Sequence, residues 1–102
     1  MKTIENGNSN GSPYSAKDSR KPVNFYCAAP SAGRVEIVGD FNHWRPMPMQ
    51  RLLDGWWFKR LELGHGHHLY RFIVDGKTQL DPKASGIGHD EQDERASLVA
   101  VS

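Results

Sequence analysis

The sequence lacks the features that mark several large classes of protein. Cys27 is the only cysteine among 102 residues, so no disulfide can form within the chain. No apolar run is long enough to span a bilayer, and the first residues lack the apolar segment of a signal peptide. We therefore expect a cytoplasmic location. The formal net charge of +1 gives no electrostatic footprint for nucleic acid or for an anionic membrane, and we expect neither as a partner.

The usual signatures of catalysis are also missing. Asp40, Asp75 and Asp81 lie beside glycine, proline or a predicted turn, where aspartate bends and caps the chain. Cys27 falls on the apolar side of a predicted strand and is expected to be a small core residue. No glycine-rich phosphate loop is present. We expect a protein that is not an enzyme and that needs no cofactor.

The length of the chain is enough for one small domain and not for two. Residues 1–20 are rich in asparagine, serine, glycine and lysine, and we expect them to form a disordered tail. Residues 21–102 are expected to form the domain. No helical period persists there, and short alternating runs separated by turn residues predict an all-β antiparallel sandwich.

Alternation and turn residues together place the strands. Asp54-Gly55 and Asp75-Gly76 are strong hairpin signals. Residues 83–95 are polar and carry four carboxylates, so an exposed and mobile loop is expected. Strands are expected over residues 23–29, 35–41, 56–63, 69–74, 78–80 and 96–101.

The stretch Val35–Trp44 reads VEIVGDFNHW, and the rest of the predicted domain is organised around it. Its apolar residues alternate with polar ones, as in a strand with one buried face. Gly39 has no side chain to pack, so the strand is expected to bend there or to admit a close neighbour. Trp44 follows the strand end, directly before the proline-containing segment 45–48. A large aromatic on a stiff loop is well placed to face solvent or a ligand.

This stretch resembles the GDFN-x-W motif of family 48 carbohydrate-binding modules. These modules are the glycogen-recognising domains of AMP-activated protein kinase β subunits and the N-terminal domains of isoamylases and branching enzymes. The resemblance covers residues 23–101 and continues in order through Asp54–Trp57, Leu61–Leu63, Tyr70–Gly76 and Asp81-Pro82. It implies an immunoglobulin-like β-sandwich that binds α-1,4-linked glucans, such as glycogen, starch or maltooligosaccharides, and has no catalytic activity.

The resemblance also implies which residues bind sugar. Trp44 matches the family's first sugar-stacking tryptophan, and Arg71 stands where a basic residue often hydrogen-bonds sugar hydroxyls. Thr78 stands where many members carry a second stacking tryptophan. Ala96 is nearest to the position of an asparagine that contacts sugar. One aromatic wall and one hydrogen-bonding group are therefore missing, and the sequence predicts weak glucan binding.

The faces of the expected strands predict which aromatic side chains are buried. Trp57 occupies an aromatic position of the family motif, which assigns it to the core. Trp56 and Phe58 have the opposite parity and are expected to be partly exposed. The core aromatic residues expected are Phe41, Trp57, Tyr70 and Phe72.

Two alternatives remain open. A regulatory or protein-interaction module would keep the sandwich without a sugar site; the missing partners of Trp44 favour it, while Trp44 and Arg71 favour a glucan partner. The histidine-rich turn of His65, His67 and His68 suggests a metal site, because imidazole is a common zinc and nickel ligand. No cysteine or carboxylate joins them at a recognisable spacing. We expect solvated turn residues and no metal.

Overall fold

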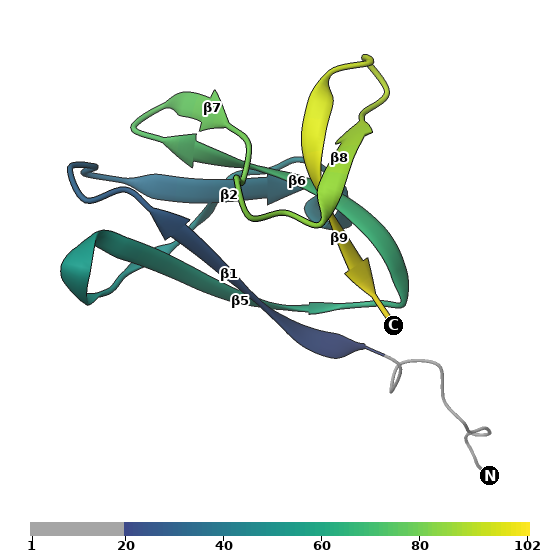
Figure 1. Cartoon of the computed structure of the whole chain (residues 1–102), viewed down its shortest axis with the longest axis horizontal. Helices are drawn as coiled ribbons and strands as arrows, with labels where there is room; N and C mark the ends of the chain where they lie inside the picture. Colours follow the sequence, from purple (N-terminus) through teal and green to yellow (C-terminus); the bar gives the residue numbers. More distant parts are fainter. Residues whose placement is uncertain (1–19) are drawn as a thin grey trace, which may run out of the picture.

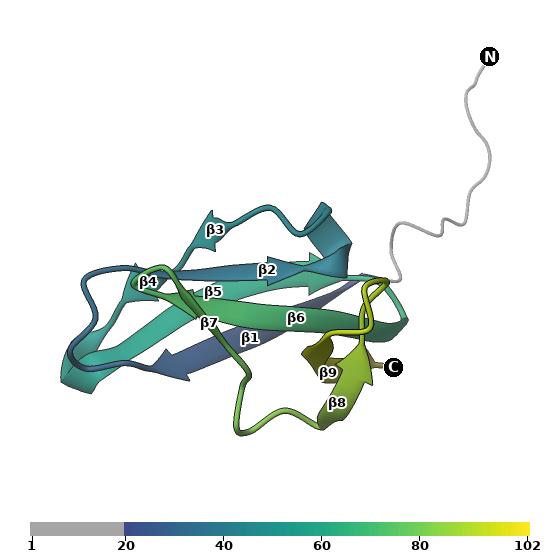
Figure 2. The same ribbon diagram turned by 90° about the horizontal axis from the view of Figure 1, so that it is seen from above.

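The structure is a computed structural model that describes residues 20–102. Two antiparallel sheets lie face to face, as the two views of the chain show (Figure 1 and Figure 2). The predicted all-β sandwich is confirmed. The tail expected over residues 1–20 lies, apart from its last residue, outside the described range.

The smaller sheet has three strands in the order β1-β5-β4. β1 and β5 pair along their whole length, from Lys21 opposite Leu63 to Ala28 opposite Trp56. β1 is an edge strand, so one row of its backbone groups has no strand partner among residues 20–102. The bounds are β1 (Lys21–Ala28), β4 (Gln50–Arg51) and β5 (Trp56–Leu63).

The larger sheet is built around one long strand, β6. The first half of β6 pairs with β9 and its second half pairs with β2 and β7. The order is β3-β2-β6-β9-β8, with β7 added to β6. No helix in this part of the chain is long and apolar enough to cross a membrane. The bounds are β2 (Val35–Gly39), β3 (Met47–Pro48), β6 (Gly66–Val74), β7 (Lys77–Gln79), β8 (Gly86–His89) and β9 (Arg95–Val101).

The core forms where the apolar faces of the two sheets meet. Phe72 from β6 is 1% exposed and lies edge-on to Tyr70, with ring centroids 5.7 Å apart. Tyr70 packs in the same way on Phe25 of β1, at 4.8 Å. The buried Trp57 donates its indole N–H to the carbonyl of Ala29 at 3.1 Å. The predicted burial of Trp57, Tyr70 and Phe72 is confirmed, as is the partial exposure of Trp56 and Phe58.

The prediction for Phe41 is wrong, because its ring is only partly buried. β2 ends at Gly39, and Phe41 lies in a short 3₁₀ turn, η2 (Asp40–Asn42). The ring packs against the edge of the core instead, 6.2 Å from the ring of Phe25. The alternation that suggested burial continues past the point where the strand stops.

Both predicted hairpins are present. At the β6–β7 turn, Asp75 and Gly76 have φ of 48° and 83°, the two left-handed residues that a type I′ turn requires. Asp75 also caps the loop before β2, since its Oδ1 accepts the N–H groups of Gly33 and Arg34 at 2.9 Å. Asp54 and Gly55 form the turn from β4 into β5.

A partly buried polar network fixes the connection between β7 and β8. The Tyr70 hydroxyl donates to Asp81 Oδ2 at 2.6 Å. The Asp81 N–H donates to Oγ of Ser97, which is fully buried, at 2.7 Å. Burial, and then the hydrogen bond to Asp81, raise the pKa of Tyr70 far above its ordinary value. The network ties the segment after β7 to β6 and β9.

Candidate functional site

The turn that carries Trp44 is held by hydrogen bonds of its own backbone and of the Asn42 side chain. Asn42 Oδ1 accepts the N–H of Gly39 at 3.2 Å, and Asn42 Nδ2 donates to the carbonyl of Arg45 at 2.6 Å. The Trp44 N–H donates to the carbonyl of Gly39 at 2.9 Å. His43 and Trp44 both have left-handed φ, 61° and 57°. Residues 39–45 therefore form a tight, fixed turn. The Asn42 side chain bonds the backbone at both ends of this turn, which explains why an asparagine stands two residues before the tryptophan.

Gly39 is required by a close approach between β2 and β6. A Cβ built on Gly39 would lie 2.3 Å from ring atoms of Phe41 and 2.8 Å from the carbonyl oxygen of Leu69. The next residue, Asp40, accepts the Leu69 N–H at 3.0 Å through Oδ2. The end of β2 is thus clamped to β6, and the clamp sets where the Trp44 turn begins.

We expect Gly39→Ala to lower the free energy of unfolding by about 1–3 kcal/mol, because the Leu69 carbonyl cannot move aside without distorting β6. Gly64→Ala is the matched control. No atom lies within 4 Å of a Cβ there, so its cost should stay below about 0.5 kcal/mol. Urea denaturation of both variants measures the difference. Equal costs would contradict the close approach.

Trp44 and Arg71 lie against one another on the outer face of the larger sheet. The Arg71 guanidinium carbon is 4.8 Å from the centroid of the Trp44 ring, a cation–π contact. The sequence predicted that Trp44 would face solvent or a ligand. Its ring is only partly exposed, because the Arg71 guanidinium lies against it.

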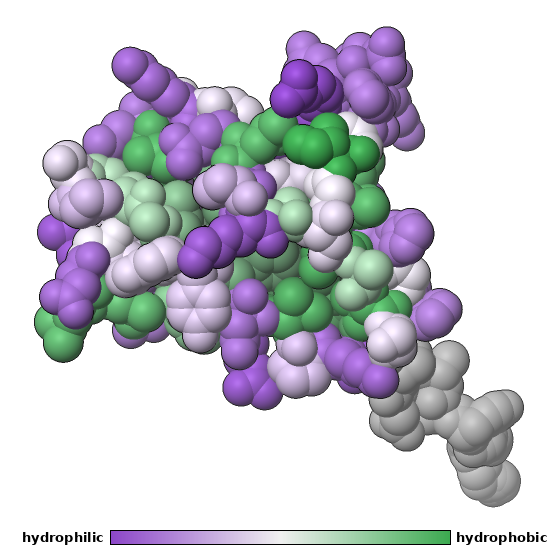
Figure 3. All heavy atoms as spheres, in the orientation of Figure 1, coloured by the Kyte–Doolittle hydropathy of each residue, from purple (hydrophilic) through white to green (hydrophobic). Residues whose placement is uncertain are grey.

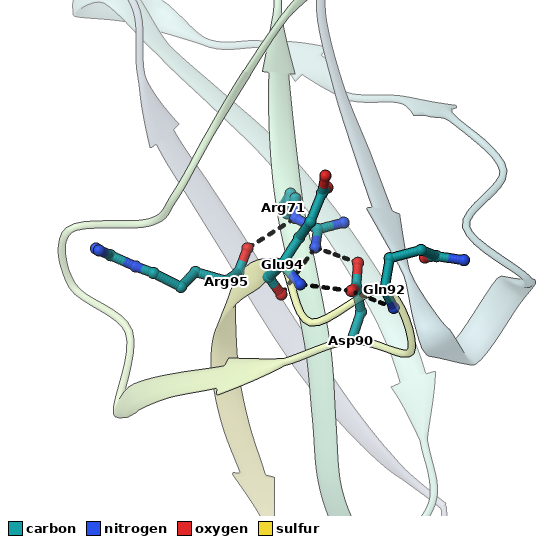
Figure 4. A network of polar contacts seen from close by, with 5 residues as sticks. All are labelled: Arg71, Asp90, Gln92, Glu94 and Arg95. Carbon is teal, nitrogen blue, oxygen red and sulfur yellow. Dashed lines mark hydrogen bonds and ion pairs between the residues drawn. The ribbon is translucent and has the colours of Figure 1, made fainter.

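Arg71 is also held by the acidic turn between β8 and β9 (Figure 4). Its Nε donates to the carbonyl of Arg95 at 2.9 Å, and its Nη2 donates to Asp90 Oδ2 at 2.5 Å and to the carbonyl of Glu94 at 3.3 Å. The side chains of Arg71 and Asp90 are 12% and 8% exposed. Of the five guanidinium N–H groups, only the two on Nη1 have no partner in the described part of the chain.

Asp90 is the centre of this turn, and sequence reasoning missed it. Its Oδ1 accepts the N–H groups of Gln92 and Glu94 at 2.9 Å, while Oδ2 accepts Arg71 (Figure 4). Residues 83–95 are mostly exposed, as predicted, but they do not form a simple loop, because the segment contains β8 and a tight turn. An aspartate that starts a turn was a visible signal, but its pairing with Arg71 was not.

The ion pair makes the stability of this turn depend on pH. The Arg71 guanidinium, and then the N–H of Glu94, hold the pKa of the Asp90 carboxyl below its ordinary value of 3.8. A lowered pKa means that the stabilisation is complete above the unfolded-state pKa and is lost as pH falls through the folded-state pKa. The melting temperatures of the parent and Asp90→Asn should therefore differ at pH 7 and converge below about pH 4. A gap that stays constant over this range would contradict the ion pair.

Thr78 and Ala96 stand where the family has two further sugar contacts, and they lie in different environments. Thr78 is exposed and lies opposite Ile73 on β6. It therefore shares the outer face with Arg71 and is its diagonal neighbour, at about 7–8 Å between Cα atoms. Ala96 is fully buried and offers neither a polar group nor an accessible surface. Trp44, Arg71 and Thr78 thus lie on one face, and Ala96 takes no part.

The histidine turn does not assemble a metal site. Within residues 20–102, no group of three or more histidine, cysteine, aspartate or glutamate side chains is placed to hold an ion. His68 Nε2 lies 2.8 Å from the carbonyl of Gly64, and its Nδ1 lies 3.7 Å from Asp40 Oδ1. His65 and His67 are exposed.

A separate apolar groove opens between the two sheets, away from Trp44. Its volume is about 830 Å³, and β1, Trp56 and the segment after Asp81 contribute to its walls. Apolar side chains gather in the hollow between the layers in the space-filling view (Figure 3). Leu53, at its rim, is 86% exposed.

An aromatic ring on a fixed turn with a guanidinium beside it offers the stacking surface and the hydrogen-bond donors that a carbohydrate-binding module needs. Comparison with known proteins agrees with this class. Residues 22–102 match the family described as the glycogen recognition site of AMP-activated protein kinase, and the chain belongs to that family.

Similar curated proteins are bacterial 1,4-alpha-glucan branching enzymes GlgB. The one from Lactobacillus acidophilus is 40% identical over 66 residues, covering 59% of this chain and 10% of the enzyme. The one from Shewanella sp. MR-4 is 39% identical over 84 residues, covering 74% of this chain and 11% of the enzyme. The one from Synechococcus sp. CC9605 is 32% identical over 98 residues, covering 88% of this chain and 12% of the enzyme. The chain thus spans about a tenth of the length of these relatives.

Proposed function

We propose that this protein binds α-1,4-glucans without catalysis, by stacking a glucose ring on Trp44. The observation that carries the proposal is the fixed Trp44 turn, backed by Arg71, in a chain of the glycogen-recognition family. A glucose ring has an apolar patch of C–H bonds, which an aromatic face accepts, and a rim of hydroxyls. The two free N–H groups of Arg71 Nη1 are the donors available to that rim.

The expected affinity is low. Thr78 stands where a second stacking tryptophan would be, so Trp44 is the one stacking residue expected on this face. Three of the five N–H donors of Arg71 already bond residues 90–95. A stacked aromatic is worth about 1–3 kcal/mol, by analogy with base stacking. We therefore expect dissociation constants for maltooligosaccharides on the order of millimolar, which corresponds to about 4 kcal/mol.

Thr78→Trp should tighten maltoheptaose binding at least about fivefold, since it supplies a second stacking surface worth about 1 kcal/mol or more. Lys77→Trp is the control, because residue 77 has the opposite parity and is also exposed. Titration calorimetry on the parent and both variants measures the effect. Equal affinity in the two variants would show that Thr78 does not border the sugar.

A second candidate function is binding an extended segment of a partner protein. One edge of β1 has no strand partner among residues 20–102, and an apolar groove lies beside it. These features favour this function, since an added strand gains backbone hydrogen bonds and places apolar side chains in such a groove. This function does not use Trp44, which is not among the residues that line the groove. Loss of glucan binding on substitution of Trp44 therefore separates the two candidates.

A further inference from the structure

Arg71 is the charged group that lies against the Trp44 ring, with its guanidinium carbon 4.8 Å from the ring centroid. A guanidinium beside an aromatic ring is well suited to bind phosphate through two parallel hydrogen bonds. A glucan whose hydroxyls carry phosphate monoesters presents about −1.5 to −2 charges per ester at neutral pH. A free Arg71 would therefore draw phosphorylated glucan to this face.

Arg71 is not free. Asp90 lies against Nη2, and both side chains are almost excluded from solvent, at 12% and 8% exposure. Asp90 is fixed in turn by the N–H groups of Gln92 and Glu94, so its carboxylate cannot rotate away without opening the turn. Glu91, Asp93 and Glu94 add further negative charge to the same turn. The cation is thus neutralised in place.

We infer that Asp90 is a specificity-determining residue, which neutralises Arg71 and sets the Trp44 face for neutral α-glucan against phosphorylated α-glucan. This inference rests on the proposed function, because it concerns the same face. Asp90 does not contact the sugar in this account. It acts through Arg71 by cancelling its charge and by occupying the Nη2 edge, where a phosphate would bind.

The test compares maltoheptaose with maltoheptaose carrying a 6-phosphate, using titration calorimetry at low salt. The parent should bind the neutral sugar more tightly. In Asp90→Asn the ratio of the two affinities should move toward the phosphorylated sugar by about three- to tenfold, the effect of one unit charge at about 7 Å when water screens the pair to an effective dielectric constant of about 35–75. Asp93→Asn removes the same charge from the same turn without touching Arg71. It should move the ratio less than about twofold.

A ratio that moves equally in the two variants would overturn the inference, as would a parent that prefers the phosphorylated sugar. Should Asp90→Asn fail to fold, the salt dependence of the parent's affinity for the phosphorylated sugar tests the inference instead. A neutralised Arg71 predicts that the affinity for the phosphorylated sugar stays level or rises between about 20 and 300 mM salt, since screening weakens repulsion. A steep fall would mean that Arg71 acts as a free cation. A parent that binds neither sugar overturns the proposed function itself, and binding of both at equal affinity overturns only the inference.

Discussion

Replacing Phe72 with alanine is expected to lower the free energy of unfolding by about 3–5 kcal/mol, the usual cost of removing a core aromatic side chain. Phe72 lies in the middle of β6, is 1% exposed and packs edge-on to Tyr70. β6 joins β2, β7 and β9, so a cavity there loosens the whole larger sheet. The total free energy of unfolding of a domain of this size is only about 5–15 kcal/mol.

Phe58→Ala is the matched control for this prediction. Phe58 is partly exposed on the outer face of the smaller sheet, where its ring contacts Tyr26 at 5.2 Å between centroids. Its loss should cost only about 1 kcal/mol. Urea denaturation followed by tryptophan fluorescence measures both. Similar midpoints for the two variants would show that the core lies elsewhere.

Trp44→Ala is expected to abolish measurable maltooligosaccharide binding while leaving the sandwich folded. Within residues 20–102, Trp44 is the one aromatic ring that lies against Arg71. Losing about 1–3 kcal/mol from a complex worth about 4 kcal/mol leaves too little binding free energy to detect. The fold should survive, because the turn is held by Gly39, Asn42 and backbone groups and not by the indole.

The control for Trp44 is Trp56→Ala. Trp56 is partly exposed too, but it lies on the smaller sheet beside the apolar groove, with the Lys83 ammonium 5.6 Å from its ring centroid. This variant should bind maltoheptaose like the parent. If Trp56→Ala weakened binding and Trp44→Ala did not, the sugar would bind to the other sheet.

The fold could be predicted from the sequence because its signals are local. Tyr70 and Phe72 alternate with Arg71 within one strand, and that period alone predicts which side chains face the core. Asp75-Gly76 predicts its own turn, since glycine and aspartate tolerate left-handed φ. Phe41 was misplaced because the period continues beyond Gly39, where the close approach of Leu69 ends the strand.

The site could be predicted only in part, because its decisive contact is not local. Trp44 and Arg71 could be assigned to one face from motif and parity. The pairing of Arg71 with Asp90 joins residues 19 positions apart, and it depends on how the β8–β9 turn folds over the sheet. Four carboxylates stand between residues 90 and 94, and nothing in their order indicates which one reaches the guanidinium.

The most direct test of the glucan-binding proposal is a titration of the isotope-labelled protein with maltoheptaose, followed by NMR. The indole N–H of Trp44 and the Nε–H of Arg71 should shift together with a millimolar dissociation constant, while the indole signals of Trp56 and Trp57 stay in place. Shifts confined to Trp56 and β1, or no shift at high maltoheptaose, would contradict the proposal.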